Sequence, residues 1–374
     1  MPGDQQAVIA YLNDPSSYGG DIDRVEAIET HASLVFIAGD RVYKMKRAVK
    51  YAYLDFSTLE LRRTACEREL ALNRRTAPGL YIDVRPLVRT AGGRLSFSEN
   101  GEPVEWIVVM RRFDQALLFD ALAKTKRLDR ATINRLADHI ARFHQLAEPR
   151  LDYGGASEMR EIAEVQHQCL ATAQQAGFAP AEVGGVLEKW RKQLSSVSGL
   201  LDWRRAAGKV RLCHGDLHLR NICLLDGQPT LFDCLEFSES LASIDVLYDL
   251  AFLVMDLEHR GLAQLANRVF NRYLDRSAED EGLAAMPLFL SLRAAIRAHV
   301  TATALESAGA DREVRRGSDP GHVGAVRGVH GDRLSNVRAP APIGQRAAAQ
   351  VGGVDEGGAR GVQLRHEHVS AVDA

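Results

Sequence analysis

Hydrophobic and polar residues alternate with a period of two in several early segments of the chain. Successive side chains of a strand point to opposite faces of a sheet, so this pattern predicts strands with one buried face. The tripeptide Ala38-Gly39-Asp40 separates the apolar segment 34–37 from the alternating segment 41–46 and is typical of a tight turn. We therefore predict an antiparallel sheet built mainly from residues 25–30, 34–37, 41–46, 80–89 and 106–110.

A helical period replaces this alternation in other segments. Residues 57–75 form one amphipathic pattern, in which the apolar row from Leu61 to Leu72 is interrupted by Glu69. The chain thus predicts an α+β protein, with a small antiparallel sheet and one helix followed by a larger, mainly helical part. In that larger part, helices are expected over residues 158–176, 180–203 and 243–304.

The composition is that of an ordinary globular protein, with 374 residues, 46% hydrophobic, 26% charged and a formal net charge of -2. This near-neutral charge gives no indication of a nucleic-acid or membrane-surface partner. Five scattered cysteines argue against a disulfide framework. The sequence shows no secretory leader, and no apolar stretch is expected to reach membrane-spanning length. We therefore expect a cytoplasmic protein.

The composition changes near the end of the chain. Residues 311–374 contain no aromatic residue and no Lys, Met, Cys or Thr. Such a segment cannot bury enough apolar surface to offset the entropy of ordering it. We predict that residues 309–374 are disordered or poorly packed. A further hypothesis is that the reading frame changes near Arg312.

The strongest chemical signal is an ordered set of three side chains, Asp216, Asn221 and Asp233. A loop that begins at Gly215 can fold so that Asp216 and Asn221 face one pocket. The turn signal Asp226-Gly227 lies between apolar segments, so a hairpin would deliver Asp233 beside Asn221. On a kinase scaffold, one carboxylate accepts the proton of the attacking hydroxyl, while an Asn and a second Asp hold Mg²⁺ against the ATP phosphates. We predict Asp216 as the base, with Asn221 and Asp233 as metal ligands.

This segment resembles the catalytic and metal-binding segments of the aminoglycoside phosphotransferase family, relatives of the protein kinases. The resemblance covers most of residues 25–305. It implies a two-lobed protein-kinase-like fold, with a nucleotide-binding lobe at 1–110 and a helical lobe with the catalytic loop at 111–308. ATP and Mg²⁺ would lie between the lobes, and the γ-phosphate would pass to a hydroxyl of a small-molecule substrate that the motif does not identify. The family's His-Gly-Asp-x-His-x-x-x-Asn run and later Asp correspond to His214, Gly215, Asp216, His218, Asn221 and Asp233.

A kinase small lobe also needs a strand lysine for the α- and β-phosphates and a helix glutamate that orients it. Lys44 and Lys46 share one face of their predicted strand, and Lys44 lies where the resemblance places the family's strand lysine. Glu69 is the expected partner, because a carboxylate on the buried stripe of a helix needs a cation. Lys46 and Glu67 stay open as the alternative members of this pair.

The strand at 106–110 would leave the small lobe and become the hinge of a kinase architecture. We therefore expect backbone groups of Val109, Met110 and Arg111 to hydrogen-bond the edge of the adenine. The sequence has neither a Gly-x-Gly-x-x-Gly loop before the lysines nor a Gly-x-x-x-x-Gly-Lys-Ser/Thr P-loop. The missing glycine-rich loop argues against a protein kinase more than against ATP binding.

Two rival hypotheses stay open. The first is a nucleotide-binding regulatory module with weak catalysis. The second is a zinc protein, although its candidate ligands lack the paired Cys-x-x-Cys spacing of structural zinc sites. Proteins that resemble this chain often continue into a P-loop kinase domain, so the altered tail raises the hypothesis that such a partner domain is missing. The candidate zinc ligands are Cys213, His214, His218 and Cys223.

Overall fold

A computed structural model describes residues 2–30, 32–51, 54–97, 100–172 and 180–314 of the protein. Contacts divide the chain into two compact units, Met1–Ala325 and Val326–Ala374, and every described residue belongs to the first. Helix α10 (Met286–Val314) continues past the tail boundary predicted at residue 308, so the first residues of the predicted tail are helical. The rest of that tail lies outside the described residues.

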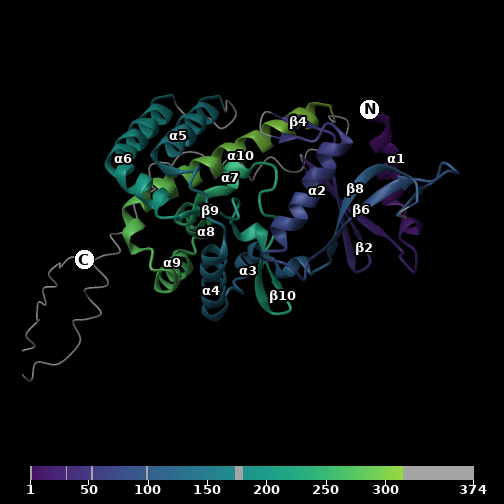
Figure 1. Ribbon diagram of the computed structural model, residues 1–374, viewed down its shortest axis with the longest axis horizontal. Coiled ribbons are helices and arrows are strands. Elements are labelled where there is room, and N and C mark those ends of the chain that lie inside the picture. Colours follow the sequence, from purple (N-terminus) through teal and green to yellow (C-terminus); the bar gives the residue numbers. More distant parts are fainter. Residues whose placement is uncertain (1, 31, 52–53, 98–99, 173–179, 315–374) are drawn as a thin grey trace, which may run out of the picture. The chain divides into compact units, whose positions relative to one another are not determined.

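The small lobe is built around a six-stranded sheet in which every neighbouring pair of strands is antiparallel. The predicted antiparallel sheet is thus confirmed. Its strands in spatial order are β1 (Val25–Glu29), β2 (Ser33–Ala38), β3 (Arg41–Lys46), β8 (Glu102–Arg111), β6 (Tyr81–Arg89) and β7 (Leu95–Ser96). Figure 1 labels its strands β2, β6 and β8. A short edge strand, β7, completes it.

Helices α1 (Pro2–Asn13) and α2 (Leu59–Asn73) cover opposite faces of this sheet. Ile107 of β8 lies in a buried cluster with residues of α1. Its neighbour Val108 lies instead in a cluster that contains Cys66 of α2. Successive side chains of a strand alternate between faces, so α1 and α2 must lie on the two sides of β8.

The large lobe is mainly helical, as predicted. Helix α5 packs against α6, α4 packs against α9, and α8 contacts both α9 and α10. Figure 1 shows α5 and α6 as neighbouring helices on the far side of the large lobe from the sheet. The helices other than α10 are α3 (Phe119–Lys124), α4 (Arg130–Leu146), α5 (Gly155–Thr172), α6 (Pro180–Ala206), α7 (Glu239–Ala242), α8 (Val246–His259) and α9 (Ala263–Ser277).

Short strand pairs shape the loops of the protein. The predicted hairpin turn at Asp226-Gly227 joins β10 to β11, and both turn residues have positive φ, at 50° and 76°. Two consecutive residues with positive φ are what a tight two-residue hairpin loop requires. The short pairs are β4 (Lys50–Tyr51) with β5 (Leu54–Asp55), β9 (Val210–Leu212) with β12 (Ser243–Asp245), and β10 (Ile222–Leu225) with β11 (Gln228–Leu231).

One helical stretch corrects an expectation from the sequence. Residues Asp280–Val300 are long and apolar enough to cross a membrane, judged by length and composition alone. In the structure, however, Phe289 and Leu292 of this stretch are fully buried, and its α10 part packs against α8. The core helix of a globular protein can satisfy the same criteria as a membrane span, and 44% of the apolar window of this stretch is buried within the protein.

A buried arginine joins three parts of the large lobe. The Arg204 guanidinium in α6 donates to both carboxylate oxygens of Asp245, at 2.6 and 2.8 Å, and to Glu279 at 2.8 Å. The Arg204 side chain is fully buried and that of Asp245 nearly so. Burial alone would lower the pKa of Arg204, but the two carboxylates raise it, so the guanidinium stays charged.

We predict that Arg204→Met destabilises the protein by about 3–5 kcal/mol, because it leaves the Asp245 carboxylate buried without its cation. Urea unfolding at neutral pH measures the loss. The control is Arg191→Met, which removes an exposed ion pair with Glu164 and should cost at most about 1 kcal/mol. Equal losses in the two variants would show that the buried network contributes no more than a surface pair.

Candidate active site

The buried carboxylate of Glu69 holds two lysines of β3. Its Oε1 lies 2.8 Å from Lys44 Nζ and its Oε2 lies 2.5 Å from Lys46 Nζ. Burial alone would raise the pKa of Glu69, but the two ammonium groups lower it to about 2. The alternative residue Glu67 points elsewhere and pairs with Arg63 on an exposed part of α2. The structure thus places the predicted Lys44–Glu69 pair together and adds Lys46 to it.

Lys44 also reaches across to the large lobe. Its Nζ lies 2.6 Å from Oδ1 of Asp233, which lies two positions after the end of β11. Burial alone would lower the pKa of Lys44, but the charges of Asp233 and Glu69 raise it well above its usual value. The two lysines differ in depth, because the Lys44 side chain is 14% exposed and that of Lys46 only 1%. Lys44 is therefore the more accessible of the two lysines.

The loop between β9 and β10 brings Asp216 and Asn221 together. The Asn221 side-chain amide Nδ2 donates to Oδ2 of Asp216 at 2.8 Å and to the Asp216 carbonyl at 2.9 Å. Gly215 allows this loop to turn, since its φ is 83° and an added Cβ would come within 2.9 Å of Leu235. The folding of the loop therefore matches the prediction made from the spacing of these residues.

The Asp216 carboxylate is partly exposed and ionised. His218 Nδ1 accepts a hydrogen bond from the Arg220 amide, so the proton of a neutral imidazole lies on Nε2, which is 3.3 Å from Asp216 Oδ2. Burial opposes ionisation, but His218, with smaller contributions from His214 and Arg293, lowers the pKa of Asp216 below its usual range. A carboxylate in this state can accept a hydrogen bond from an alcohol at neutral pH.

Asp249 of α8 holds the backbone of this loop. Its Oδ1 accepts from the Gly215 amide at 2.9 Å, and its Oδ2 accepts from the His214 amide at 3.1 Å. On the other side of the same turn, the Arg293 guanidinium of α10 donates to the Gly215 carbonyl at 3.3 Å. Two helices therefore fix the peptide groups that lead directly into Asp216.

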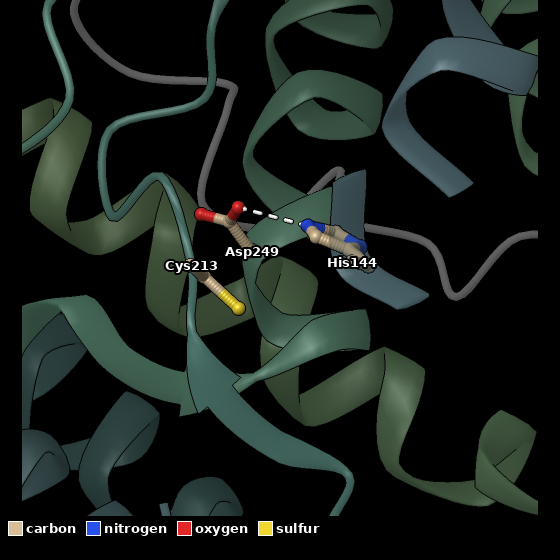
Figure 2. A group of neighbouring side chains, drawn as sticks. All are labelled: His144, Cys213 and Asp249. Carbon is tan, nitrogen blue, oxygen red and sulfur yellow. Dashed lines mark hydrogen bonds and ion pairs between the residues drawn. The ribbon is translucent and has the colours of Figure 1, made fainter. Parts of the chain in front are cut away.

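Figure 2 shows the surroundings of Asp249, where His144 Nε2 points at the carboxylate and Cys213 lies beside them. The carboxylate can only accept, so Nε2 of His144 carries a proton, and Nδ1 forms a hydrogen bond of 2.9 Å with the Tyr273 hydroxyl. Cys213 Sγ donates to the Ile244 carbonyl, and burial raises the pKa of this thiol well above its usual value. These three side chains could surround a cation by distance. Since each is already hydrogen-bonded and the thiol is protonated, we assign the cluster to support of the loop.

The zinc hypothesis finds no support in the described residues. Cys213 makes the contact given above, and His214 Nε2 bonds to the Phe232 carbonyl at 2.9 Å. His218 turns toward Asp216, and burial raises the pKa of Cys223 to about 12. A zinc ligand set requires thiolates and imidazole nitrogens that converge on one point, and these side chains point to different partners.

The predicted metal ligands lie at the end of one hairpin. The Phe232 amide donates to the Asn221 carbonyl at 3.0 Å, so Asp233 follows directly after the residue paired with Asn221. The Asn221 amide nitrogen is used on Asp216, which leaves its side-chain oxygen as the acceptor available for a cation. The Asp233 side chain is 42% exposed and carries the second ligand oxygens. Carboxylate and amide oxygens suit Mg²⁺, which keeps several waters, so the donor set fits this metal.

Two small-lobe side chains that the sequence analysis did not single out hold the backbone around Asp233. The Tyr81 hydroxyl accepts from the Asp233 amide at 3.2 Å, and Oδ1 of Asn73 accepts from the Cys234 amide at 2.9 Å. Asp233 has a φ of 61°, a left-handed conformation that costs free energy in a residue other than glycine. Asn73 lies one helical turn after Glu69 on the buried side of α2, and this position was the only feature of the sequence that could have indicated its role. No feature of the sequence indicated the role of Tyr81.

The three residues predicted to contact adenine lie at the end of β8. Val109 and Met110 pair with strands on both sides, and the Arg111 amide donates to the Leu80 carbonyl at 2.8 Å. The Arg111 amide is therefore already used, and a contact of the Arg111 carbonyl with adenine stays a prediction. The contacts of Val109 and Met110 stay predictions. A cavity of about 490 Å³ lies next to this strand end, lined by Glu26, Ile37, Asp40, Arg112, Phe113, Asp114 and Gln115.

A small antiparallel lobe with a lysine–glutamate pair, joined to a helical lobe with an Asp-Asn-Asp loop, defines a protein-kinase-like fold. Residues 56–288 match the model of the phosphotransferase enzyme family, APH. The chain belongs to this family, which confirms the resemblance found in its sequence.

The similar proteins with curated sequences are uncharacterised. One from Mycobacterium tuberculosis and one from Mycobacterium bovis are each 33% identical over 281 residues, covering 74% of this chain and 54% of theirs. The chain thus spans about half the length of these relatives. Among solved structures, a choline/ethanolamine kinase family protein from Mesorhizobium loti superposes with a TM-score of 0.52 at 17% identity, covering 94% of this chain and 99% of that chain. This likeness supports the fold alone.

We predict that Asp249→Asn destabilises the protein by about 1–3 kcal/mol, because an amide presents one acceptor where two backbone amides need partners. Burial opposes ionisation of Asp249, but His144 lowers its pKa, so its stabilisation is present above the usual Asp range and is lost as the pH falls through the folded pKa. The variant should therefore lose less stability than the wild type on acidification. Urea unfolding over a pH series measures both effects.

The matched control is Asp138→Asn on α4, whose carboxylate pairs with Arg272 and Arg276 but is 37% exposed. It should change the free energy of unfolding by at most about 1 kcal/mol. If Asp249→Asn were no more costly than this control, the proposed support of the catalytic loop would be wrong.

Proposed function

We propose that the protein is an ATP-dependent phosphotransferase that moves the γ-phosphate to a hydroxyl of a small molecule. The observation that carries this proposal is the convergence of Lys44, Asp216, Asn221 and Asp233 from both lobes. Lys44 contacts Asp233, the Asn221 backbone bonds to the residue before Asp233, and Asn221 contacts Asp216. One continuous chain of contacts thus links the residue suited to bind phosphate with the carboxylate suited to bind the acceptor.

Asp216 would orient the acceptor and take its proton. Its lowered pKa makes it a weak base, so it would accept a hydrogen bond from the hydroxyl first. The proton would then move to the carboxylate as the oxygen–phosphorus bond forms and the acidity of the hydroxyl rises. This order suits a loose transition state, in which positioning contributes more than early proton removal. The Asn221 amide at 2.8 Å holds the carboxylate in place for that step.

Asn221 and Asp233 would hold Mg²⁺, which when bound neutralises charge on the phosphates. Lys44 would give up its contact with Asp233 and donate to the phosphates, while Glu69 keeps its ammonium group aligned. The nucleotide base would enter from the cavity at the end of β8, beside Arg112 and Phe113.

Phosphotransferases of one fold act on many alcohols, so fold does not specify the substrate. The M. loti protein is named for choline and ethanolamine, which makes amino alcohols reasonable members of a first panel. The curated relatives are about twice as long as the region that they share with this chain.

We predict that Asp216→Asn lowers phosphoryl transfer by about 10²–10⁴-fold, because the amide cannot accept the proton of the acceptor. ADP release with a panel of small alcohols, together with release in their absence, measures turnover. ATP affinity should change little, since Asp216 faces the acceptor side. The control is Asp275→Asn on the exposed surface of α9, which should keep wild-type turnover.

Unchanged turnover in Asp216→Asn would overturn the assignment of the base. Nucleotide binding by the wild type without turnover on any acceptor, including water, would instead favour the regulatory nucleotide-binding module. The Asp216→Asn comparison and the binding measurement therefore separate an incorrect residue assignment from an incorrect enzyme class.

We predict that Asp233→Asn abolishes the Mg²⁺-dependent part of the thermal stabilisation by ADP. A ligand at about 100 times its dissociation constant stabilises the folded state by about 2.7 kcal/mol, so loss of the metal ligand should be visible as a smaller shift. Melting curves with ADP, with and without Mg²⁺, measure it. Asp83→Asn, at an exposed position on β6, is the control. A full Mg²⁺-dependent shift in Asp233→Asn would exclude this residue as a ligand.

A further inference from the structure

Lys46 and Glu236 form a buried ion pair between the two lobes that the proposed mechanism does not use. Lys46 Nζ hydrogen-bonds to Glu236 Oε1 and lies 2.5 Å from Glu69 Oε2. The two side chains are only 1% and 10% exposed, and the Lys46 ammonium lies 5.3 Å from the ring centre of Phe56. Glu236 belongs to the same loop as Asp233, three positions further along.

We propose that Lys46 and Glu236 are a positioning pair that fixes Asp233 and Glu69 for metal and nucleotide binding. This inference rests on the proposed function. It assigns the second strand lysine a role different from that of Lys44. Lys44 is the lysine available to the phosphates, whereas Lys46 is an anchor.

The depth of the two lysines supports this division. The ammonium group of Lys46 is enclosed by Glu69, Glu236 and Phe56, so a phosphate could reach it only by breaking a buried pair. Lys44 is more exposed and is bonded to Asp233, the carboxylate that would turn to a metal. When a nucleotide with its metal replaces that contact, Lys44 must also serve the phosphates. Glu69 then keeps one partner that does not change, which is Lys46.

The position of Glu236 connects this anchor to the metal ligand. The chain runs from Asp233, in its left-handed conformation, through Cys234 to Glu236. The Asp233 and Cys234 amides are bonded to Tyr81 and Asn73, so the start of the loop is held by the small lobe. Lys46 holds its other end. Both ends of this short loop are therefore attached to the small lobe, and the strained residue Asp233 lies at its first end, which limits how far the backbone that carries its carboxylate can move.

The charge balance of the network agrees with a site prepared for a cation. Two lysines face three carboxylates, those of Glu69, Asp233 and Glu236. One negative charge is therefore left over, and Asp233 is the carboxylate with the greatest exposure to receive a cation. Removing Lys46 and Glu236 together leaves this balance unchanged, which allows position to be tested separately from charge.

The test compares Lys46→Met/Glu236→Met with the wild type. Apolar side chains of similar length often replace a buried ion pair without loss of stability, so we expect the double variant to fold. Because outer contacts of a metal ligand typically contribute 10- to 100-fold in metal affinity, the apparent Mn²⁺ affinity in the presence of ADP should fall by about 10-fold. Electron paramagnetic resonance of Mn²⁺, used in place of Mg²⁺, measures it. Turnover of ATP should fall by a similar factor or more.

A second variant, Glu236→Asp, keeps the charge and shortens the side chain by one methylene. Glu236→Asp should also weaken Mn²⁺ binding. If the double variant does not fold, the Mn²⁺ affinity of Glu236→Asp tests the positioning role of the pair. The control is Arg191→Met/Glu164→Met, which removes an exposed pair of the same charges and should bind Mn²⁺–ADP like the wild type.

Each outcome separates the two proposals. If folded Lys46→Met/Glu236→Met, or Glu236→Asp, binds Mn²⁺–ADP and turns over ATP within twofold of the wild type, the pair is only structural and the inference is overturned. If the wild type binds Mn²⁺–ADP but turns over no ATP, the proposed enzyme activity is wrong. The Mn²⁺ affinities of the variants, compared with that of the wild type, then still test the role of the Lys46–Glu236 pair. A wild type that binds no Mn²⁺–ADP overturns both.

Discussion

The structure of the site depends on one buried carboxylate, Glu69, which cannot be left uncompensated in the interior. An isolated ionised carboxylate in a core is very costly, so it must gather cations. It does so with both lysines of β3, and through them it joins the helix α2, the central sheet and the loop that carries Asp233. The two lysines that balance the charge of Glu69 are thus also the contacts that hold the small lobe against the Asp233 loop.

A second carboxylate, Asp249, organises the large lobe by a different means. Glu69 is neutralised by ammonium groups, whereas Asp249 is satisfied mainly by hydrogen bonds from two backbone amides and His144. Fixed amide dipoles define a direction as well as a charge, so they can set the orientation of the peptide that precedes Asp216. In the small lobe, Glu69 therefore positions the ammonium group of Lys44. In the large lobe, Asp249 positions the backbone turn at His214 and Gly215.

Much of this could be predicted from the sequence, because the informative signals were local. The period of two placed Lys44 and Lys46 on one face, and the loop spacing placed Asp216 beside Asn221. The choice between the two lysines could not be made, since depth in the cleft is set by how α2 and the Asp233 loop pack on the strand. Tyr81 was missed for a similar reason: it joins Asp233 across a sequence separation of 152 residues. The sheet pairing that uses the Arg111 amide is likewise a tertiary property.

Exposure separates the carboxylates that support the site from those that we propose act in it. Glu69 and Asp249 have fully buried side chains, and Glu236 is 10% exposed, and each is satisfied by groups of the protein itself. Asp216 and Asp233 are 41% and 42% exposed, although they lie in the same network. A carboxylate that must exchange a protein partner for a metal or an alcohol cannot be sealed in the core, because the exchange needs an open path. The buried carboxylates therefore confer rigidity, and the two exposed ones keep oxygens available for ligands.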